Sequence, residues 1–347
     1  MQNRAIHRRL VLTTLAGTIA APAFRVAAQP AGVSQRPTDA RLVAAGKADG
    51  SLAVYTGSSA AALKADAQAF EKVYGIKVTF TQMTSGPLAA RVDQELRAGR
   101  MMPDVVISAD PGSLQRWVAG GHLGKLPDMP FPQRTDHLAP IQTIYQSLFH
   151  NTAALPREQV PQKWEDLLQP RFSGRIILGT PRIGPAYATQ YFALWKSSQH
   201  GERFFEKLAA QKPRLVTTPA LVAQLVTAGE GLVGFTGIPY DAQNIINSNP
   251  GAPIAYSYLD PITSARTFAG INAKAAKPAA AALFVAWLMS VEGQTVHNGE
   301  GRASSLLGNL PGTLDAPDLK RVRTDLTTES VIPEYKDLIN TFDRIFR

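Results

Sequence analysis

Three short apolar runs in the first third of the chain are each followed by a polar loop and a segment with helical periodicity. The runs are Ser51–Tyr55, Ile76–Thr81 and Asp104–Ser108. After the first run, apolar residues recur at helical spacing over Ala60–Tyr74, and Gly75 follows, as glycines do where helices end. Strand, loop and helix in succession predict a parallel sheet with helices on its faces.

The stretch Arg175–Trp195 repeats this order in the middle of the chain. Ile176–Leu178 predicts a strand and a loop of Gly, Thr and Pro follows. One helix face is then predicted by the spacing i, i+4, i+7 and i+8 of Tyr187, Tyr191, Leu194 and Trp195. Gly184 permits a turn, Pro185 suits a first helical turn, and the free N–H groups there favour anionic or polar ligand groups. The alternative is a plain strand-to-helix turn, since short glycine-containing motifs often occur without function.

The remaining apolar segments indicate a second sheet and a return to the first. Ile141–Phe149 predicts a crossing, and Asp260–Arg266 predicts a hinge that leads back. Further strands are predicted at Gly231–Phe235 and Ile254–Leu259. Helices are expected at Thr38–Lys47, Phe204–Leu208, Leu221–Val226, Ala279–Val291 (amphipathic) and Glu334–Phe346.

Four loops share one composition: each follows a predicted strand, contains Gly, offers Ser or Thr, and opens a helix. They are Thr56–Ser59, Thr84–Pro87, Thr180–Ala186 and Thr236–Tyr240. In open parallel sheets, ligands bind beyond the carboxyl ends of the strands, so two facing sheets would bring these loops to one cleft. Each Ser or Thr alone is more simply a helix cap. The candidate ligand-binding residues are Thr56, Gly57, Ser58, Ser59, Ser85, Gly86, Asp110, Arg182, Gly184, Pro185, Ala186, Thr236 and Tyr240.

Composition and the N-terminus place the chain outside the cytoplasm. Its 347 residues include no cysteine, which excludes structural disulfides and a lipid-anchoring cysteine. Residues 1–28 combine basic residues, the apolar stretch Leu10–Phe24 and a small-residue end, the pattern of a secretory signal peptide. Arg8-Arg9 resembles a twin-arginine export signal, with Sec export as the alternative. Removing 1–28 lowers the formal charge from +9 to +5, too little to indicate nucleic-acid binding.

Several segments, in this order, resemble periplasmic solute-binding proteins of ABC uptake transporters, in the iron(III), phosphonate, thiamine and polyamine branch of extracellular solute-binding protein family 1. They read LAVYTGSSA, FEKVYGIKVTF, PDVVISADPGSLQRWVAGGHL, PQKWEDLLQPRFSGRIILGTPRIGPAY, FFEKLAAQKPRLV and AAALFVAWLMSVEGQ. The resemblance implies a monomeric α/β protein of the type II periplasmic binding fold, with two hinged lobes that close on a small ligand. Its partner would be an inner-membrane permease.

The resemblance also implies the division of the chain. A signal peptide at 1–28 and a tail at 29–48 precede the first lobe, and the polar part of that tail, Gln29–Pro37, is expected to be disordered. That lobe comprises 49–140 and, with C-terminal helices, 266–347, while the second lobe comprises 141–265. We expect the mature protein to lie soluble in the periplasm, without a lipid anchor.

Iron-binding members of that branch carry two adjacent tyrosines after the strand that matches Gly231–Phe235, and many carry a first-loop His. Here the first place reads Ile238-Pro239-Tyr240-Asp241 and the second is Ser59. The six His show no metal-ligand spacing. We therefore expect neither a metal site nor a cofactor. The site at Gly184–Ala186 matches the place where relatives hold an anion, with Arg182 two residues before it.

An enzyme is the main alternative from another class. The chain holds no G-x-S-x-G elbow, no H-E-x-x-H and no phosphate-binding P-loop, so we expect no catalytic residues. Asp104 is expected to flank a buried strand, while Asp110 fits a ligand site or a turn equally. The four tryptophans fit the core. A periplasmic sensor without a transport role is a third reading.

The expected ligand is a small organic anion, such as a phosphonate, sulfonate or carboxylate, or chelated iron. Helix N-termini and hydroxyls favour an anionic head group. A polyamine would need carboxylates and aromatic walls, and the four loops contain few acidic residues. Bare ferric iron is the alternative ligand.

Overall fold

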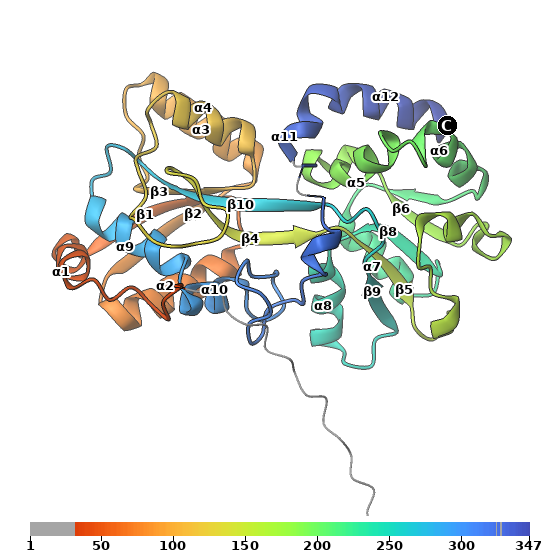
Figure 1. The fold of residues 1–347 in the computed structure, drawn as a ribbon, viewed down its shortest axis with the longest axis horizontal. Helices are drawn as coiled ribbons and strands as arrows, with labels where there is room; N and C mark the ends of the chain where they lie inside the picture. The colour runs from red at the N-terminus through yellow and green to blue at the C-terminus, as the bar shows by residue number, and fades with distance from the viewer. Residues whose placement is uncertain (1–31, 324, 327) are drawn as a thin grey trace, which may run out of the picture.

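The computed structural model describes residues 32–323, 325–326 and 328–347, which fold into two α/β lobes side by side (Figure 1). Each lobe is built on a five-stranded sheet with helices on its faces, and two strands run between the lobes. The predicted α/β two-lobed fold is therefore confirmed. The predicted signal peptide, residues 1–28, lies outside the described residues.

Lobe 1 contains the sheet with strand order β2-β1-β3-β10-β4. Strands β1, β2 and β3 run parallel, and β10 pairs antiparallel with both β3 and β4. Its elements are α1 (Ala40–Asp49), β1 (Ser51–Thr56), α2 (Ala60–Tyr74), β2 (Lys77–Gln82), α3 (Ser85–Arg97), β3 (Val105–Ser108), α4 (Pro111–Ala119), β4 (Ala139–Tyr145), β10 (Ser264–Ile271), α9 (Pro278–Leu288) and α10 (Val291–Asn298).

Lobe 2 contains the sheet with strand order β7-β6-β8-β5-β9. Strands β6, β7 and β8 run parallel, and β5 pairs antiparallel with β8 and β9. Its elements are β5 (Ser147–Asn151), β6 (Ile176–Gly179), the 3₁₀ turn η4 (Pro181–Ile183), α5 (Pro185–Trp195), α6 (Gly201–Ala210), β7 (Arg214–Val216), α7 (Pro219–Thr227), β8 (Val233–Gly237), α8 (Pro239–Ser248) and β9 (Ile254–Ser257).

The chain crosses between the lobes at Gln146 and again at residues 258–263, where the two crossings are joined. The Gln146 N–H donates to the Thr263 carbonyl at 3.0 Å. The first crossing lies a few residues beyond the expected boundary at 140/141, because β4 continues the sheet of lobe 1 to Tyr145. The segment 260–266, expected to be only a hinge, also contains the start of β10, whose short and polar side chains give little strand signal.

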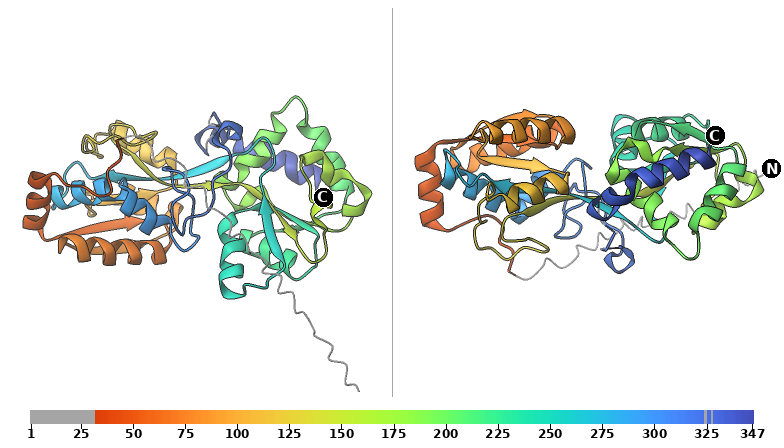
Figure 2. Two further views of the ribbon diagram at one scale, coloured as in Figure 1. Left: turned by 60° about the horizontal axis from the view of Figure 1, so that its bottom comes forward. Right: turned by 90° about the horizontal axis from the view of Figure 1, so that it is seen from above.

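The C-terminal helices α11 (Thr328–Val331) and α12 (Tyr335–Ile345) pack on lobe 2, against α5 and α6 (Figures 1 and 2). Val331, Leu338 and Phe342 join the buried apolar cluster of lobe 2. The last helix matches the prediction for Glu334–Phe346, but the C-terminal helices belong to lobe 2 and not to lobe 1, with which 266–347 was grouped. The chain thus returns to lobe 1 with β10 and then crosses to lobe 2 once more.

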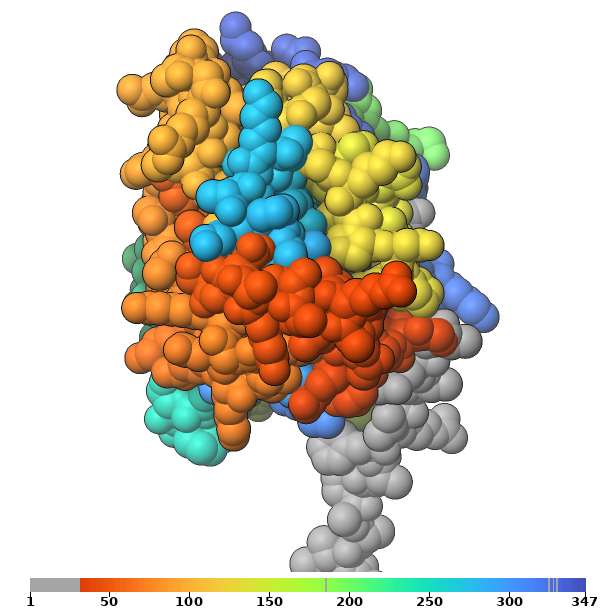
Figure 3. All heavy atoms as spheres, turned by 90° about the vertical axis from the view of Figure 1, so that its left-hand side faces the viewer, coloured from red at the N-terminus to blue at the C-terminus, as the bar shows by residue number. Residues whose placement is uncertain are grey.

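The core of lobe 1 is organised around α9, which is buried on all sides rather than amphipathic as predicted. Residues from Ala280 to Met289 lack solvent exposure except Ala282. Helix α1 covers the face of α9 away from the sheet, and Gly46 permits the close approach because a Cβ there would lie 3.0 Å from Leu283 Cδ2. Figure 3 shows this end of the lobe, with α1 in red against the blue segment that contains α9.

The described part of the predicted tail is fastened to this core, which corrects the expectation of disorder there. The carbonyls of Ser34 and Gln35 accept hydrogen bonds from the first N–H groups of α10, at 3.2 and 3.0 Å. Arg36 pairs with Glu292 at 2.8 Å, and Pro37 is buried. The tail satisfies helix N–H groups that would otherwise lack partners.

Three of the four tryptophans are buried, as predicted: Trp117, Trp164 and Trp287 are at most 2% exposed. Trp195 is only partly buried, and the Lys196 ammonium lies 4.4 Å from its ring centre. Within the described residues, no single helix is long and apolar enough to cross a membrane. The pair α9 and α10 passes that test only together and bends by 78° between its two helices.

Asp104 fixes the sheet of lobe 1 to α9, in keeping with its expected structural role. Its carboxylate is 4% exposed and accepts from the Ala53 N–H at 2.9 Å and from the Lys277 N–H at 3.0 Å. Because both donors are backbone groups, Asp104 joins β1 to the start of α9.

We predict that Asp104→Ala lowers the free energy of unfolding by about 3 kcal/mol, since two partly buried N–H groups lose a charged acceptor. Denaturant titration of the variant and of Asp128→Ala, an exposed position in the same lobe, measures this. A loss no larger than that of the control would contradict the assignment.

Candidate functional site

The carboxyl ends of the parallel strands in both sheets lie between the lobes, where the loops after them come together (Figures 1 and 2). Strands β1 and β3 end there in lobe 1, and β6 and β8 in lobe 2. The predicted residues fall on these loops. This is the position where open α/β sheets bind ligands.

In lobe 1, the loop after β1 is tightly held yet leaves one buried hydroxyl without a partner. Thr56 is fully buried, and its Oγ1 accepts from the Ser58 N–H at 2.9 Å. The Gly57 N–H donates to the Ile107 carbonyl at 2.7 Å. Ser59 caps α2 by accepting from the Ala62 N–H at 3.2 Å. Ser58 is 6% exposed, and among the described residues its Oγ has no hydrogen-bond partner.

The other predicted residues of lobe 1 differ in how free they are to bind. Ser85 opens α3 beside the first loop, because a Cβ on Gly57 would lie 3.5 Å from its Oγ. Gly86 is exposed. Asp110 caps α4, accepting from the Gly112 N–H at 3.1 Å and from the Ser113 hydroxyl at 2.6 Å. The structure therefore gives Asp110 the turn role that the sequence left open.

In lobe 2, the turn before α5 presents one free backbone donor. Pro185 begins the helix and has no N–H, while the Tyr187 and Ala188 N–H groups both donate to the Gly184 carbonyl at 3.0 Å. Within the described chain, the Ala186 N–H donates to no protein group. It lies in the first turn of an eleven-residue helix, where the partial positive charge of the helix is strongest.

Gly184 has φ 152° and ψ 164°, a conformation that side chains rarely adopt. A Cβ would meet little there, since the nearest atom is Tyr187 Cδ2 at 4.0 Å. A branched substitution at Gly184 would therefore strain the backbone rather than only block a ligand. For this reason, substitution at Gly184 is a poor test of binding.

Arg182 does not turn toward the free N–H in this structure. Its guanidinium pairs with Asp343 on α12, with Nε 3.3 Å from Oδ1. The Tyr335 hydroxyl also donates to the Pro181 carbonyl at 2.9 Å. The C-terminal helix thus holds the turn before α5 from its outer side.

The end of β8 and the start of α8 add a second buried hydroxyl and a half-buried carboxyl group. Thr236 is fully buried, and in the described part of the chain its Oγ1 lacks a partner. Tyr240 is half-buried in the first turn of α8. Beside it, Asp241 has an Oδ2 that is buried without a partner, and burial raises the pKa of this carboxyl to about 6.

Tyr187 lies near Asp241, across the starts of α5 and α8. Burial, and secondarily the Asp241 carboxylate, raise the pKa of Tyr187 to about 12. A phenol and a carboxyl group thus share one poorly solvated region of lobe 2. Such a region can accept and donate hydrogen bonds but disfavours an unpaired negative charge.

Four residues of this region were not among the predicted ligand-binding residues: Gln146, Thr180, Tyr187 and Asp241. Of these, Thr180 belongs to a loop that was predicted, and Asp241 was considered only as a catalytic carboxylate of an enzyme. Gln146, at the crossing, donates from Nε2 to the Ala186 carbonyl at 3.3 Å, and its buried Oε1 finds no partner among the described residues. Thr180 is 8% exposed, also with an unpartnered hydroxyl. The sequence offered one signal for such site residues, which is a polar residue inside an apolar run, as at Gln146.

A cavity of about 790 Å³ lies outside this region, between the end of α5, the hinge and the segment around Arg321. Two of its charged groups are in ion pairs: Arg321 pairs with Asp260 at 2.9 Å, and Lys196 pairs with Glu334. Because the loops after the parallel strands do not converge there, we place the candidate site between the lobes.

No group of three or more His, Cys, Asp or Glu that could hold a metal ion occurs among the residues that the structure describes. The candidate site offers oxygen atoms from hydroxyl groups, from the phenols of Tyr187 in α5 and Tyr240 in α8, and from the carboxyl group of Asp241. This donor set suits hydrogen bonding to a polar ligand.

Comparison with known proteins finds a similar chain and solved structures with this fold. A protein of Haemophilus influenzae, described as uncharacterized, is 24% identical over 322 residues, which cover 84% of this chain and 89% of that one. The iron-bound structure of HitA from Pseudomonas aeruginosa has a TM-score of 0.67 and 20% identity, over 83% of this chain and 99% of that one. The structure of AfuA from Actinobacillus pleuropneumoniae, with exogenous fructose-6-phosphate bound, has a TM-score of 0.60 and 22% identity, over 85% and 98%.

At these identities, the two solved structures show the fold alone. The family evidence is the match of residues 52–302, which span both lobes, to the model described as Bacterial extracellular solute-binding protein. Because this match covers most of the chain, the chain belongs to the bacterial extracellular solute-binding proteins.

Proposed function

We propose that the protein binds a small organic anion between its lobes in the periplasm and delivers it to an ABC uptake transporter. The observation that carries this proposal is the set of buried, unpartnered hydroxyls of Ser58, Thr180 and Thr236 at facing strand ends. A buried polar group without a partner costs free energy. On binding, ligand oxygen atoms would supply the missing hydrogen-bond partners and so offset that cost.

The negative charge of the ligand is assigned to the start of α5. The Ala186 N–H is unpaired within the described chain and lies where the helix favours anions. We propose that Gly184, Pro185 and Ala186 approach the head group through their backbone, and that Ser58 and Ser85 face it from lobe 1. The Arg182 ion pair with Asp343 leaves the head group to neutral donors.

The rest of the ligand is proposed to carry hydroxyl groups. Asp241 and Tyr187 occupy a poorly solvated region, where a hydroxyl donor would satisfy the unpartnered Oδ2 of Asp241. Tyr240 precedes Asp241 in the first turn of α8. Fructose-6-phosphate in the AfuA structure is a ligand of this kind, a phosphate with a polyol body.

No catalytic step is part of this proposal, because the family consists of binding proteins. A periplasmic sensor would share the ligand site but not the permease. Ligand-dependent binding to the permease, measured with both proteins purified, distinguishes a transport protein from a sensor.

Bare ferric iron is the second candidate, since the HitA structure is iron-bound and Tyr187, Tyr240 and Asp241 offer hard oxygen atoms. Only one tyrosine occupies the place after β8 where iron-binding relatives are expected to carry two. We predict that ferric salts added to the purified protein give no stoichiometric tyrosine-to-iron absorption band, whereas a ferric chelate can bind through its organic anion. Such a band with bare iron would make ferric iron the favoured ligand, ahead of the organic anion.

We predict that Thr236→Val has opposite effects on stability and binding. Removing an unpartnered buried hydroxyl at nearly constant volume should stabilise the ligand-free protein by about 1 kcal/mol. Affinity for the best ligand from a panel of phosphates, phosphonates, carboxylates and ferric citrate should fall at least about tenfold, or 1.4 kcal/mol. Thermal shift identifies the ligand, and calorimetry measures the affinity.

Thr267→Val is the matched control, because the buried Thr267 hydroxyl already bonds Gln142 Oε1 at 3.1 Å. That variant should lose stability without losing affinity. Unchanged affinity in Thr236→Val would place the ligand elsewhere, and no response to any member of the panel would contradict the proposed ligand class.

We predict a pH effect at Asp241. Because burial raises the pKa of Asp241 from 3.8 to about 6, the folded ligand-free protein binds a proton between these values that the unfolded chain has released. Stability therefore falls as the pH rises through this window, by about 2 to 3 kcal/mol at most. Asp241→Asn should remove this fall, while the exposed control Asp337→Asn should not. Unfolding titrations at pH 4, 5 and 7.5 measure it, and identical slopes for wild type and Asp241→Asn would contradict it.

A further inference from the structure

The lobes also touch beside the hinge, at the loop after α10, which lies against β4 because the Thr143 N–H donates to the Ser304 carbonyl at 3.3 Å. Helix α8 of lobe 2 faces the loop after α10 of lobe 1, and the Asn247 Nδ2 donates to the Glu300 carbonyl at 3.3 Å. Gln243, one turn earlier on α8, packs on Gly301, where any Cβ would overlap its side chain. Gln243 also donates from Nε2 to Asn247 Oδ1 at 2.8 Å, so the two side chains form one unit.

The loop that receives α8 is held in shape before any partner arrives. Glu300 and Gly301 both have positive φ, at 56° and 70°, and the Gly301 N–H donates to the Gly312 carbonyl at 2.8 Å. Arg302 is 8% exposed; it bonds the His297 carbonyl at 3.0 Å and pairs with Glu300 at 2.8 Å. A loop so held presents the Glu300 carbonyl in a fixed direction.

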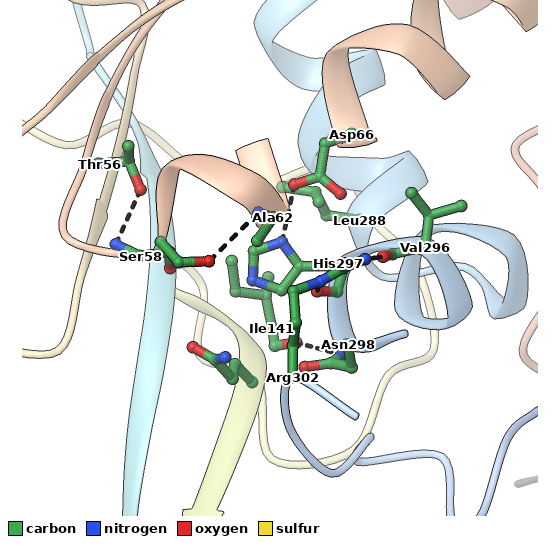
Figure 4. A network of polar contacts seen from close by, with 12 residues as sticks. Thr56, Ser58, Ala62, Asp66, Ile141, Leu288, Val296, His297, Asn298 and Arg302 are labelled. Carbon is green, nitrogen blue, oxygen red and sulfur yellow. Dashed lines mark hydrogen bonds and ion pairs between the residues drawn. The ribbon is translucent and has the colours of Figure 1, made fainter. Parts of the chain in front are cut away.

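This loop is connected through buried polar contacts to the first ligand loop (Figure 4). His297, whose carbonyl Arg302 holds, bonds Asp66 on α2 through Nδ1 at 2.7 Å, and neither side chain is exposed to solvent. Helix α2 begins at Ser59, in the loop that also contains Ser58. Figure 4 shows the residues of this connection in order across the lobe: Thr56, Ser58, Asp66, His297 and Arg302.

Helix α8 connects the contact to the candidate site from the other lobe. Tyr240, Gln243 and Asn247 lie at i, i+3 and i+7, on one face of the helix. The start of that face is at the candidate site, and its later turns reach lobe 1. A shift of α8 on ligand binding would therefore move Gln243 and Asn247 relative to the Glu300–Gly301 loop.

We propose that Gln243 and Asn247 of α8, with the Glu300–Gly301 loop, form a latch that holds the lobes together before ligand binds. The latch adds a contact between the lobes to the hinge and to the contact of α11 with α4, so it raises the population of closed protein. A ligand that needs closed lobes binds more tightly when that population is larger. The latch is independent of the identity of the ligand.

Solution scattering tests the latch without a ligand. Gln243→Ala/Asn247→Ala should increase the radius of gyration of the ligand-free protein by about 1 Å, on a value near 20 Å for a compact chain of this length. Asn244→Ala/Ser248→Ala, on the same helix but at exposed positions, is the matched control and should leave the radius unchanged. An equal radius for the latch variant and wild type overturns the proposal.

A covalent lock gives a second, independent test, because the chain contains no cysteine of its own. A Cβ on Gly301 would lie 3.3 Å from Gln243 Cβ, close to the separation of about 3.5 to 4.5 Å found in disulfides. Gln243→Cys/Gly301→Cys should form an intramolecular disulfide under mild oxidation without ligand, and each single variant should stay a free thiol.

Circular dichroism controls for folding, since Gly301 has positive φ and any side chain there is strained. Two free thiols per chain after oxidation of the folded double variant overturn the latch. Because neither readout involves a ligand, failure of the latch leaves the proposed anion site standing, and failure of anion binding leaves the latch standing.

Discussion

The antiparallel pair β4–β10 is the constraint on which the rest of the structure depends. Both strands belong to the sheet of lobe 1, and both lead directly into lobe 2, joined at the crossing by the bond from Gln146 to Thr263. These two connections determine which strand ends of the two sheets face each other. The same crossing reaches the site, because Gln146 also bonds the Ala186 carbonyl in the first turn of α5.

The energetics of the site follow from polar groups that the fold buries without partners. Cores usually satisfy such groups, as Asp104 and Thr267 illustrate with their bonded oxygen atoms. Ser58, Thr180, Thr236 and Asp241 are among the buried groups that depart from that rule, and these four lie at the facing strand ends and helix starts. A binding site that exchanges water for ligand must keep some of its polar groups without hydrogen-bond partners in the protein. This lowers the stability of the fold.

Much of the fold was predictable because alternating apolar runs and helical periods are local signals. The helices after β1 and β6 begin at the predicted Ser59 and Gly184 loops, and the Gly75 stop is observed. The start of β10 was predicted as a hinge, and the fully buried α9 was predicted as amphipathic. These predictions were wrong because the exposure of a segment depends on its neighbours in the fold. The site was predictable to the level of its loops. The partners of Arg182 and Asp110 were not, because Asp343 lies far along the chain and a cap or a ligand contact can use the same carboxylate.

The central claim is that an anionic head group binds at the start of α5, between the lobes. Anomalous diffraction from crystals grown with selenate locates an anion directly, because selenium scatters anomalously and the oxyanion has the geometry of a phosphate or sulfonate head group. The account predicts an anomalous peak within hydrogen-bond reach of the Ala186 N–H and of at least one hydroxyl among Ser58, Thr180 and Thr236. Peaks only at exposed lysine and arginine side chains, with the space between the lobes unoccupied, would contradict it.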